Sequence, residues 1–284
     1  MKNLFLIILF VATFFSACTD YVQQIEDRHG ERDTSDDVLS SSSGSTSSST
    51  KGREFSSSAP KSSSDKVTEP AEVTVGSMTD ARDGRTYKTV KIGTQTWMAQ
   101  NLNYKVNCKK EKGWCYHDVL AKCYNEDTTN CAKYGRLYSW AVAMDSAGEW
   151  NTNGKGCGYG STCSPTDPVR GVCPQGWHLP SQTEWNTLFT AVGGQSTAGK
   201  VLKSTSGWYN SGNGTDAFSF SALPAGLMSY DWDFRGEGYD AYFWSSTEDG
   251  SFSAFNMDLD YFNVEANLDN NKKNYVFSVR CLMD

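Results

Sequence analysis

The chain has 284 residues, with 26 lysines and arginines against 33 aspartates and glutamates, so its formal net charge is −7. This acidic balance argues against a nucleic-acid binder, because counterion release requires clustered lysine and arginine and the sequence has no basic run. All nine tryptophans lie from Trp97 onward, whereas residues 40–64 are mainly serine. About 210 residues therefore remain for one globular domain, which is enough for a substantial core.

The first residues have the layout of an export signal. One positive charge in residues 1–3 precedes an almost unbroken apolar run over residues 4–15, as in a secretory signal peptide. A run this short does not cross a bilayer, which needs about 20 apolar residues. We therefore predict that residues 1–17 are removed after export.

The run ends in Phe15-Ser16-Ala17-Cys18, which resembles the lipobox of bacterial lipoproteins. The resemblance implies that Cys18 is acylated and anchors the chain in the lipid bilayer, since each buried methylene adds about 0.8 kcal/mol. Thr19 follows, where an Asp would retain a proteobacterial lipoprotein in the inner membrane. The predicted location is the outer membrane, on its periplasmic or external face. An ordinary secretory signal, with Cys18 incidental, is the alternative.

Residues 18–71 are predicted to carry the lipidated cysteine and a disordered serine-rich linker. Fourteen of the twenty-five residues 40–64 are serine, and Phe55 is the one aromatic residue among them. Such a segment buries too little apolar surface to offset its loss of chain entropy. As a flexible coil of about fifty residues it spans on the order of 40 Å, which holds the domain, residues 72–284, clear of the lipid.

Eight further cysteines in an exported chain predict four disulfides. A zinc site is disfavoured, because their spacings lack the short gaps of zinc knuckles and no histidine pair accompanies them. Eight cysteines allow 105 pairings. Proximity favours three local pairs and leaves the last two cysteines to each other, which gives Cys108–Cys115, Cys123–Cys131, Cys157–Cys163 and Cys173–Cys281.

Two helices are predicted from apolar residues that recur at helical spacing. The first covers Leu137, Trp140, Ala141 and Met144. The second has Trp185, Leu188, Phe189 and Val192 on one face; Ser181 and Glu184 form a capping box at its start, and Gly193-Gly194 ends it.

Strands are expected elsewhere. A hairpin is predicted about Gly93-Thr94, with its strands at residues 87–92 and 95–102. Apolar residues alternate with polar ones over 255–261 and 275–281, which predicts two further strands. The predicted fold class is therefore α+β, with two helices on short, mostly antiparallel strands joined by long loops.

Seven motifs occur in order along the second part of the chain: DGRTY at 83–87, QTWMAQNL at 95–102, YGRLYSW at 134–140, CPQGWHLPS at 173–181, LPAG at 223–226, FWSSTE at 243–248 and VRCL at 279–282. Together they resemble the Fibrobacter succinogenes major paralogous domain over about residues 80–284. The resemblance implies a surface or periplasmic lipoprotein family and carries no catalytic residues.

The chain has a helix, then a cysteine, then a second helix capped by serine, and last a strand that holds the partner cysteine. This order is similar to that of C-type lectin-like domains. It is also similar to the related formylglycine-generating enzyme fold. The resemblance implies a disulfide-rich lectin-like domain in which Cys173 pairs with Cys281.

No metal or other cofactor is expected. The calcium tripeptides of sugar-binding C-type lectins do not occur, and the EF-hand-like run from Asp231 to Gly236 fails because Arg235 stands at position five and Tyr242 at position twelve. The only candidate Ca²⁺ ligands are four carboxylates in irregular geometry, for which a solvated acidic loop is the alternative: Asp231, Asp233, Glu237 and Asp240.

The same loop is rich in aromatic side chains, which bind sugars by stacking. Filling of the core is the alternative reading of these residues, and Phe243-Trp244 is expected in the core. The candidate ligand-binding residues are Trp208, Tyr209, Tyr230, Trp232, Phe234, Tyr239 and Tyr242.

An enzyme is not expected, because the sequence contains no nucleophile elbow, no zinc-protease motif and no phosphate-binding loop. His178 is read as structural. We therefore predict an envelope-anchored lipoprotein that presents a lectin-like binding domain to polysaccharide or another surface component. The alternatives are a structural or protein-binding envelope protein and a divergent enzyme of the formylglycine-generating fold.

Overall fold

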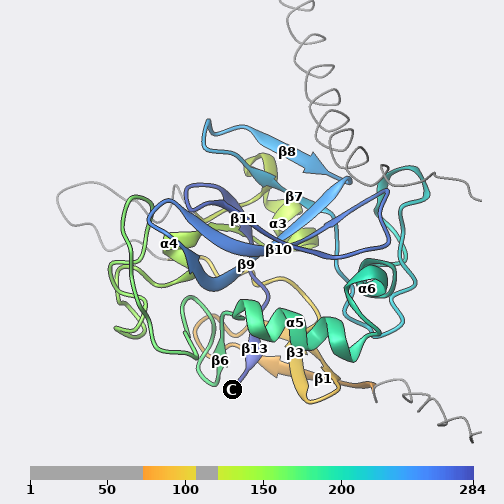
Figure 1. Cartoon of the computed structure of the whole chain (residues 1–284), viewed down its shortest axis with the longest axis horizontal. Coiled ribbons are helices and arrows are strands. Elements are labelled where there is room, and N and C mark those ends of the chain that lie inside the picture. The colour runs from red at the N-terminus through yellow and green to blue at the C-terminus, as the bar shows by residue number, and fades with distance from the viewer. Residues whose placement is uncertain (1–72, 107–120) are drawn as a thin grey trace, which may run out of the picture. The chain divides into compact units, whose positions relative to one another are not determined.

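The computed structural model of the chain describes residues 73–106 and 121–284, which all lie in one unit, Asp65–Asp284 (Figure 1). The signal peptide, Cys18, the whole tether and the Cys108–Cys115 pair lie outside the described residues. No helix among those that are described is long and apolar enough to cross a membrane.

The described chain is α+β, with short helices and a larger number of strands, as expected. The elements in chain order are β1 (Val73–Thr79), β2 (Thr86–Ile92), β3 (Gln95–Met98), β4 (Ala121–Lys122), the 3-10 turn η1 (Tyr124–Glu126), α3 (Thr128–Tyr134), β5 (Leu137–Ser139), α4 (Trp140–Ala143), β6 (Trp177–His178), α5 (Gln182–Ala191), α6 (Gln195–Leu202), the 3-10 turn η2 (Tyr209–Ser211), β7 (Ala225–Met228), β8 (Phe234–Glu237), β9 (Asp240–Asp249), β10 (Ser253–Asp260), β11 (Asn267–Lys272), β12 (Val276–Ser278) and β13 (Leu282–Met283).

One sheet joins the two ends of the described domain. Its strand order is β1-β2-β3-β13-β6, and every pairing in it is antiparallel. The predicted hairpin is confirmed: Ile92 pairs with Gln95, and Gly93 takes the positive φ of 60° that the tight turn requires. Leu282 of β13 pairs with Trp97 of β3, which brings the last strand beside the third.

The second sheet carries the long β9–β10 hairpin. Its strand order is β11-β10-β9-β7-β12-β5-β4, with β8 paired to β7. Its pairings are antiparallel except for single parallel contacts of β9 with β7 and β12. The β7–β8 hairpin extends outward from this sheet (Figure 1), and its connecting loop is therefore on the surface.

Helix α5 lies between the two sheets (Figure 1). Its capping box is confirmed, since the Ser181 side chain accepts from the Glu184 backbone and the Glu184 side chain accepts from the Ser181 backbone. The ring of Trp185 stacks on Trp97 of the first sheet at 4.6 Å and contacts Phe243 of the second sheet at 6.1 Å. This helix thus supplies the core shared by both sheets.

The helix predicted over residues 137–144 is wrong for its first half. Leu137–Ser139 forms strand β5 and pairs with β12, and only Trp140–Ala143 is helical. Ser139 has extended backbone and caps the short helix through its hydroxyl. The apolar spacing was misleading because all of these residues except Ala141 are buried, first as a strand and then as one helical turn.

Two helices were missed. Helix α3 has Asp127 as its N-cap, and α6 begins directly after the Gly193-Gly194 stop that ends α5. The terminal strand predicted over 275–281 is shorter than expected, because β12 covers only Val276–Ser278, and residues 279–281 separate it from β13.

Three of the four predicted disulfides are present in the described residues and have the predicted partners. They are Cys123–Cys131, Cys157–Cys163 and Cys173–Cys281. The last one joins the loop before β6 to the residue before β13, 108 positions later.

Candidate functional site

The loop between β7 and β8 presents two aromatic side chains to solvent. Tyr230 is 54% exposed and Trp232 is 57% exposed. Trp232 has a positive φ of 67°, which is an outlier for a bulky residue. The buried Ser229 holds the loop, because its backbone N–H donates to the Asp233 carbonyl at 2.9 Å and its hydroxyl donates to the Asp231 carboxylate. The loop is therefore ordered while its rings remain exposed.

Charged side chains lie next to these aromatic residues in the sequence, and Arg235 forms ion pairs with both carboxylates. Arg235 donates to Asp231 at 2.9 Å and to Asp233 at 3.1 Å. The hydrogen bond from the Ser229 hydroxyl, together with the Arg235 charge, holds the pKa of Asp231 below its usual range. Arg235, which interrupts the EF-hand pattern, thus pairs with two of the carboxylates that were candidate Ca²⁺ ligands.

The other two candidate calcium ligands point to different partners. Glu237 lies 4.0 Å from Lys133 Nζ. Asp240 is 8% exposed at the start of β9, where it pairs in register with Asp260 of β10. The described part of the chain holds no group of three or more potential metal ligands. The four carboxylates therefore do not form one site.

Trp208, one of the predicted ligand-binding residues, is buried. It is 5% exposed, and its indole Nε1 donates to Ser204 Oγ and to the Ala222 carbonyl, each at 3.1 Å. The Lys203 ammonium lies 5.0 Å from its ring. This tryptophan belongs to the core because its polar atom finds partners inside the protein.

Tyr209 and Tyr239 are brought together in an exposed aromatic cluster. Their rings stack at 4.5 Å, and both lie edge-on against Tyr261, which in turn contacts Phe262. Tyr209 is 51% exposed and Phe262 43%. We call these four residues the tyrosine cluster. Tyr261 and Phe262 were not among the predicted ligand-binding residues.

Phe234 and Tyr242 are half-buried and pack inward. The Phe234 ring contacts Tyr124 at 5.2 Å, and the Tyr242 ring stacks on Phe277 at 4.9 Å. Of the seven predicted ligand-binding residues, the fold exposes Tyr230 and Trp232 on one loop and Tyr209 in the tyrosine cluster. Tyr239, also in that cluster, is half-buried.

His178, the one histidine among the described residues, is held between two carboxylates. Its Nδ1 lies 2.8 Å from Asp284 and its Nε2 lies 2.9 Å from Glu184. Burial lowers the pKa of His178, but these hydrogen bonds outweigh burial and raise it overall. Because both ring nitrogens are occupied, the geometry matches the structural role expected for this residue.

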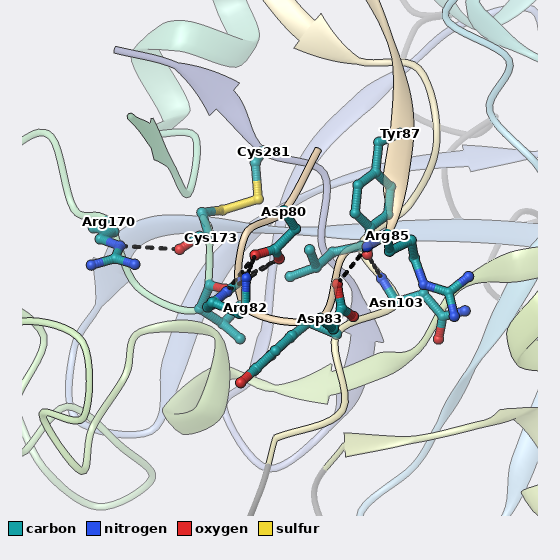
Figure 2. A network of polar contacts seen from close by, with 12 residues as sticks. Asp80, Arg82, Asp83, Arg85, Tyr87, Asn103, Arg170, Cys173 and Cys281 are labelled. Atoms are coloured by element: carbon teal, nitrogen blue, oxygen red, sulfur yellow. Dashed lines mark hydrogen bonds and ion pairs between the residues drawn. A yellow bond between two sulfur atoms is a disulfide. The ribbon is translucent and has the colours of Figure 1, made fainter. Parts of the chain in front are cut away.

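A second buried network joins the start of the domain to the long disulfide (Figure 2). The Arg82 guanidinium donates to both carboxylate oxygens of Asp80 and to the Val172 carbonyl at 2.8 Å. Arg170 donates to the carbonyl of Cys173, which is bonded to Cys281. Asp80 is fully buried and paired, so this network fixes the fold.

A cavity of about 220 Å³, which was not predicted from the sequence, lies between β2, α3 and Arg280. Five of the motifs named above contribute to its lining: DGRTY, QTWMAQNL, YGRLYSW, LPAG and VRCL. Gly135 forms part of one wall with a positive φ of 76°, where a Cβ would lie 2.8 Å from the Leu102 carbonyl. The available signal was Arg280 itself, a charged residue in an otherwise apolar terminal segment.

No curated protein and no solved structure matches the chain. The family model described as the Fibrobacter succinogenes major domain matches residues 90–283. That range covers the β7–β8 loop, the tyrosine cluster and most of the lining of the cavity. The chain therefore belongs to the Fibrobacter succinogenes major domain family.

Proposed function

We propose that this protein is an envelope-anchored binding module that holds polysaccharide through the exposed rings of the β7–β8 loop. The observation that carries the proposal is the pair Tyr230 and Trp232, both more than half exposed on a loop that Ser229 fixes. Exposed aromatic side chains on an ordered loop are typical of binding surfaces, because their burial by a ligand is favourable and little order is lost.

The polar groups beside the rings suit a hydroxyl-rich ligand. Asp231, Asp233 and Arg235 are exposed or half-exposed and lie next to the aromatic residues. Carboxylate oxygens accept from sugar hydroxyls, and a guanidinium donates to them. The unfavourable φ of Trp232 supports a role in binding, since residues with strained backbone conformations are concentrated at functional sites.

The anchor and the architecture belong to the same proposal. Acylation of Cys18 and the serine-rich linker would hold the domain at the outer membrane, where it meets extracellular or periplasmic glycans. The lectin-like resemblance is supported by the Ser181-capped helix and by the Cys173–Cys281 bond, and it stays a prediction. We propose a non-catalytic module that needs no cofactor.

Retention on insoluble cellulose, chitin and xylan, together with a glycan array, tests this function. Trp232→Ala should abolish retention of the purified protein on the polysaccharide that the wild type binds. Phe252→Ala is the matched control, since Phe252 is 55% exposed on a different turn. If both variants bind like the wild type, or if no glycan is retained, the polysaccharide function is wrong.

A protein-binding role is the second candidate, and the tyrosine cluster favours it. Tyr209 and Phe262 form an exposed aromatic patch outside the β7–β8 loop. Aromatic residues are enriched in protein interfaces. Loss of binding to an envelope protein in Tyr209→Ala, with glycan retention unchanged, would assign that patch to a protein partner.

A further inference from the structure

The cavity beside Arg280 has a charge opposite to that of the protein. Its lining includes four cationic residues and no aspartate or glutamate, although the whole chain carries a net charge of −7. The cations are Arg85, Lys88, Lys133 and Arg280. A concave site lined by one sign of charge concentrates ions of the opposite sign.

Arg280 is the buried member of this set, with 1% exposure. Its guanidinium donates to Asn101 Oδ1 at 2.6 and 3.1 Å and to the backbone carbonyls of Phe220 and Ser221. It also lies 4.3 Å from the centre of the Phe220 ring. All of these partners are neutral, and no carboxylate of the described residues forms an ion pair with it. A buried charge is costly unless a counter-charge compensates it.

The one carboxylate of the described residues that raises the pKa of Arg280, Asp216, is hydrogen-bonded to Ser221. Asp216 accepts from the Ser221 backbone at 2.7 Å and from the Ser221 hydroxyl. Burial lowers the pKa of Arg280 to about 9, and the Asp216 charge only partly offsets this effect. Asp216 lines an adjoining cavity of about 430 Å³, which shares Lys88, Ala99 and Ser221 with the cavity that Arg280 lines.

Asn101 orients the guanidinium. Its amide nitrogen donates to the Tyr134 carbonyl at 2.8 Å and to Ser278 Oγ at 3.2 Å, which leaves its oxygen facing Arg280. The other three cationic residues of the lining, Arg85, Lys88 and Lys133, are exposed. Lys133 also lies 4.0 Å from Glu237, an exposed pair that contributes little.

The remaining lining suits a small polar molecule. It includes Tyr87, whose hydroxyl accepts from the Asn103 backbone at 3.0 Å, as Figure 2 shows beside Arg85. A cavity of about 220 Å³ is below the range of about 300–1,000 Å³ of drug-sized sites. It is about seven times the 30 Å³ share of one water molecule, which corresponds to roughly one sugar ring.

We propose that this cavity binds the acidic group of a small anion, a carboxylate or phosphate carried by a unit of about one sugar ring. Arg280 supplies the buried counter-charge, and Lys88 and Lys133 supply charge nearer the solvent. The site shares no residue with the β7–β8 loop. It therefore stands independently of the polysaccharide function, and Trp232→Ala should leave it intact.

Calorimetric titration of the purified full chain tests the proposal with galacturonate, galactose 6-phosphate and neutral galactose. We expect at least one of the two acids to bind more tightly than galactose, with an affinity that falls as salt is added. Binding of galacturonate alone would identify a uronic acid unit as the source of the charge, and binding of the phosphate alone would identify a phosphorylated unit.

Substitutions of the cationic lining residues locate the binding. Lys88→Gln and Lys133→Gln should each weaken binding several-fold, and Arg280→Lys by about tenfold or more, because a lysine cannot reproduce the planar fork of the guanidinium. Lys91→Gln is the matched control, since Lys91 is exposed on the same strand and does not line the cavity. The two lysine variants keep the test valid if the Arg280 variant fails to fold.

Three outcomes would overturn the proposal. The first is that neither acid binds. The second is that galactose binds as tightly as the acids. The third is that Lys88→Gln and Lys133→Gln bind like the wild type, or that Lys91→Gln loses as much affinity as they do.

Discussion

Lys273 and Glu248 form an ion pair that is closed to solvent, with side-chain exposures of 0% and 13%. The Lys273 ammonium also donates to the Ser161 carbonyl at 2.8 Å, and the Glu248 carboxylate accepts from the Cys163 backbone at 2.9 Å. The pair therefore fastens the Cys157–Cys163 loop to the end of β9.

Lys273→Met should destabilise the domain by about 3 to 5 kcal/mol, because it leaves the Glu248 carboxylate without its counter-charge. Urea denaturation followed by tryptophan fluorescence measures this change. The double variant Lys273→Met/Glu248→Gln should lose less than the sum of the two single variants. Additive losses would contradict a direct pair.

The stability of the domain should depend on pH through His178 and Glu184. The pKa of His178 is raised above its ordinary value of 6.5, so its contribution is complete below about 6.5 and is lost as the pH rises through the higher folded value. The pKa of Glu184 is lowered from 4.5, so its contribution is present above about 4.5 and is lost as the pH falls through the lower folded value.

We therefore expect the largest contribution of this pair between about pH 4.5 and about pH 6.5. The measurement is the free energy of unfolding as a function of pH, with His178→Gln for comparison. The variant should lose the decline that the wild type shows above this window. An identical decline in both proteins would assign it to other groups.

The two tryptophans 232 and 244 should respond differently to truncation. Trp244 is fully buried, donates to the Tyr138 carbonyl at 2.7 Å and stacks on Phe277 at 4.3 Å. Trp244→Ala should cost about 3 to 5 kcal/mol or unfold the domain. Trp232→Ala should leave the melting temperature within a few degrees, since its ring faces solvent.

Trp232→Gly adds a control for backbone strain. Glycine adopts a positive φ readily, so this variant should be at least as stable as Trp232→Ala. Calorimetric melting of the three variants gives the comparison. Strong destabilisation by Trp232→Ala would show that the Trp232 side chain stabilises the fold, and it would contradict the proposed binding role of the β7–β8 loop.

The disulfides should contribute according to the length of chain that they close. The chain-entropy relation gives about 5 kcal/mol for a loop of 108 residues and about 2.5 kcal/mol for one of 8 residues. Cys173→Ser/Cys281→Ser should therefore destabilise the domain more than Cys123→Ser/Cys131→Ser does. Mass spectrometry of the unreduced protein should also join Cys108 to Cys115.

The predicted anchor is tested by Cys18→Ser. Without the thiol no diacylglycerol can be attached, so the variant should incorporate no radiolabelled palmitate and should leave the membrane fraction or remain unprocessed. Incorporation of the label into the variant would show that Cys18 is not the acylated residue. The glycan retention of the domain should be unchanged, since the anchor lies outside it.

Local signals in the sequence determined the parts of the fold that depend on neighbouring residues. The capping box of Ser181 and Glu184 and the turn at Gly93 each complete their hydrogen bonds within a few positions. Cysteine proximity predicted the local pairs Cys123–Cys131 and Cys157–Cys163, and the ordered motifs indicated the family. Cys173 and Cys281 were assigned to each other as the remaining pair, in agreement with the lectin-like resemblance.

The tertiary structure decided what depends on distant segments. Residues 137–139 form a strand because β12, more than a hundred positions later, pairs with them. Trp208 and Trp232 both occur in glycine-containing loop segments, yet only the first finds buried partners for its indole. The walls of the cationic cavity come from five separate segments, so its charge is set by tertiary packing and by no single motif.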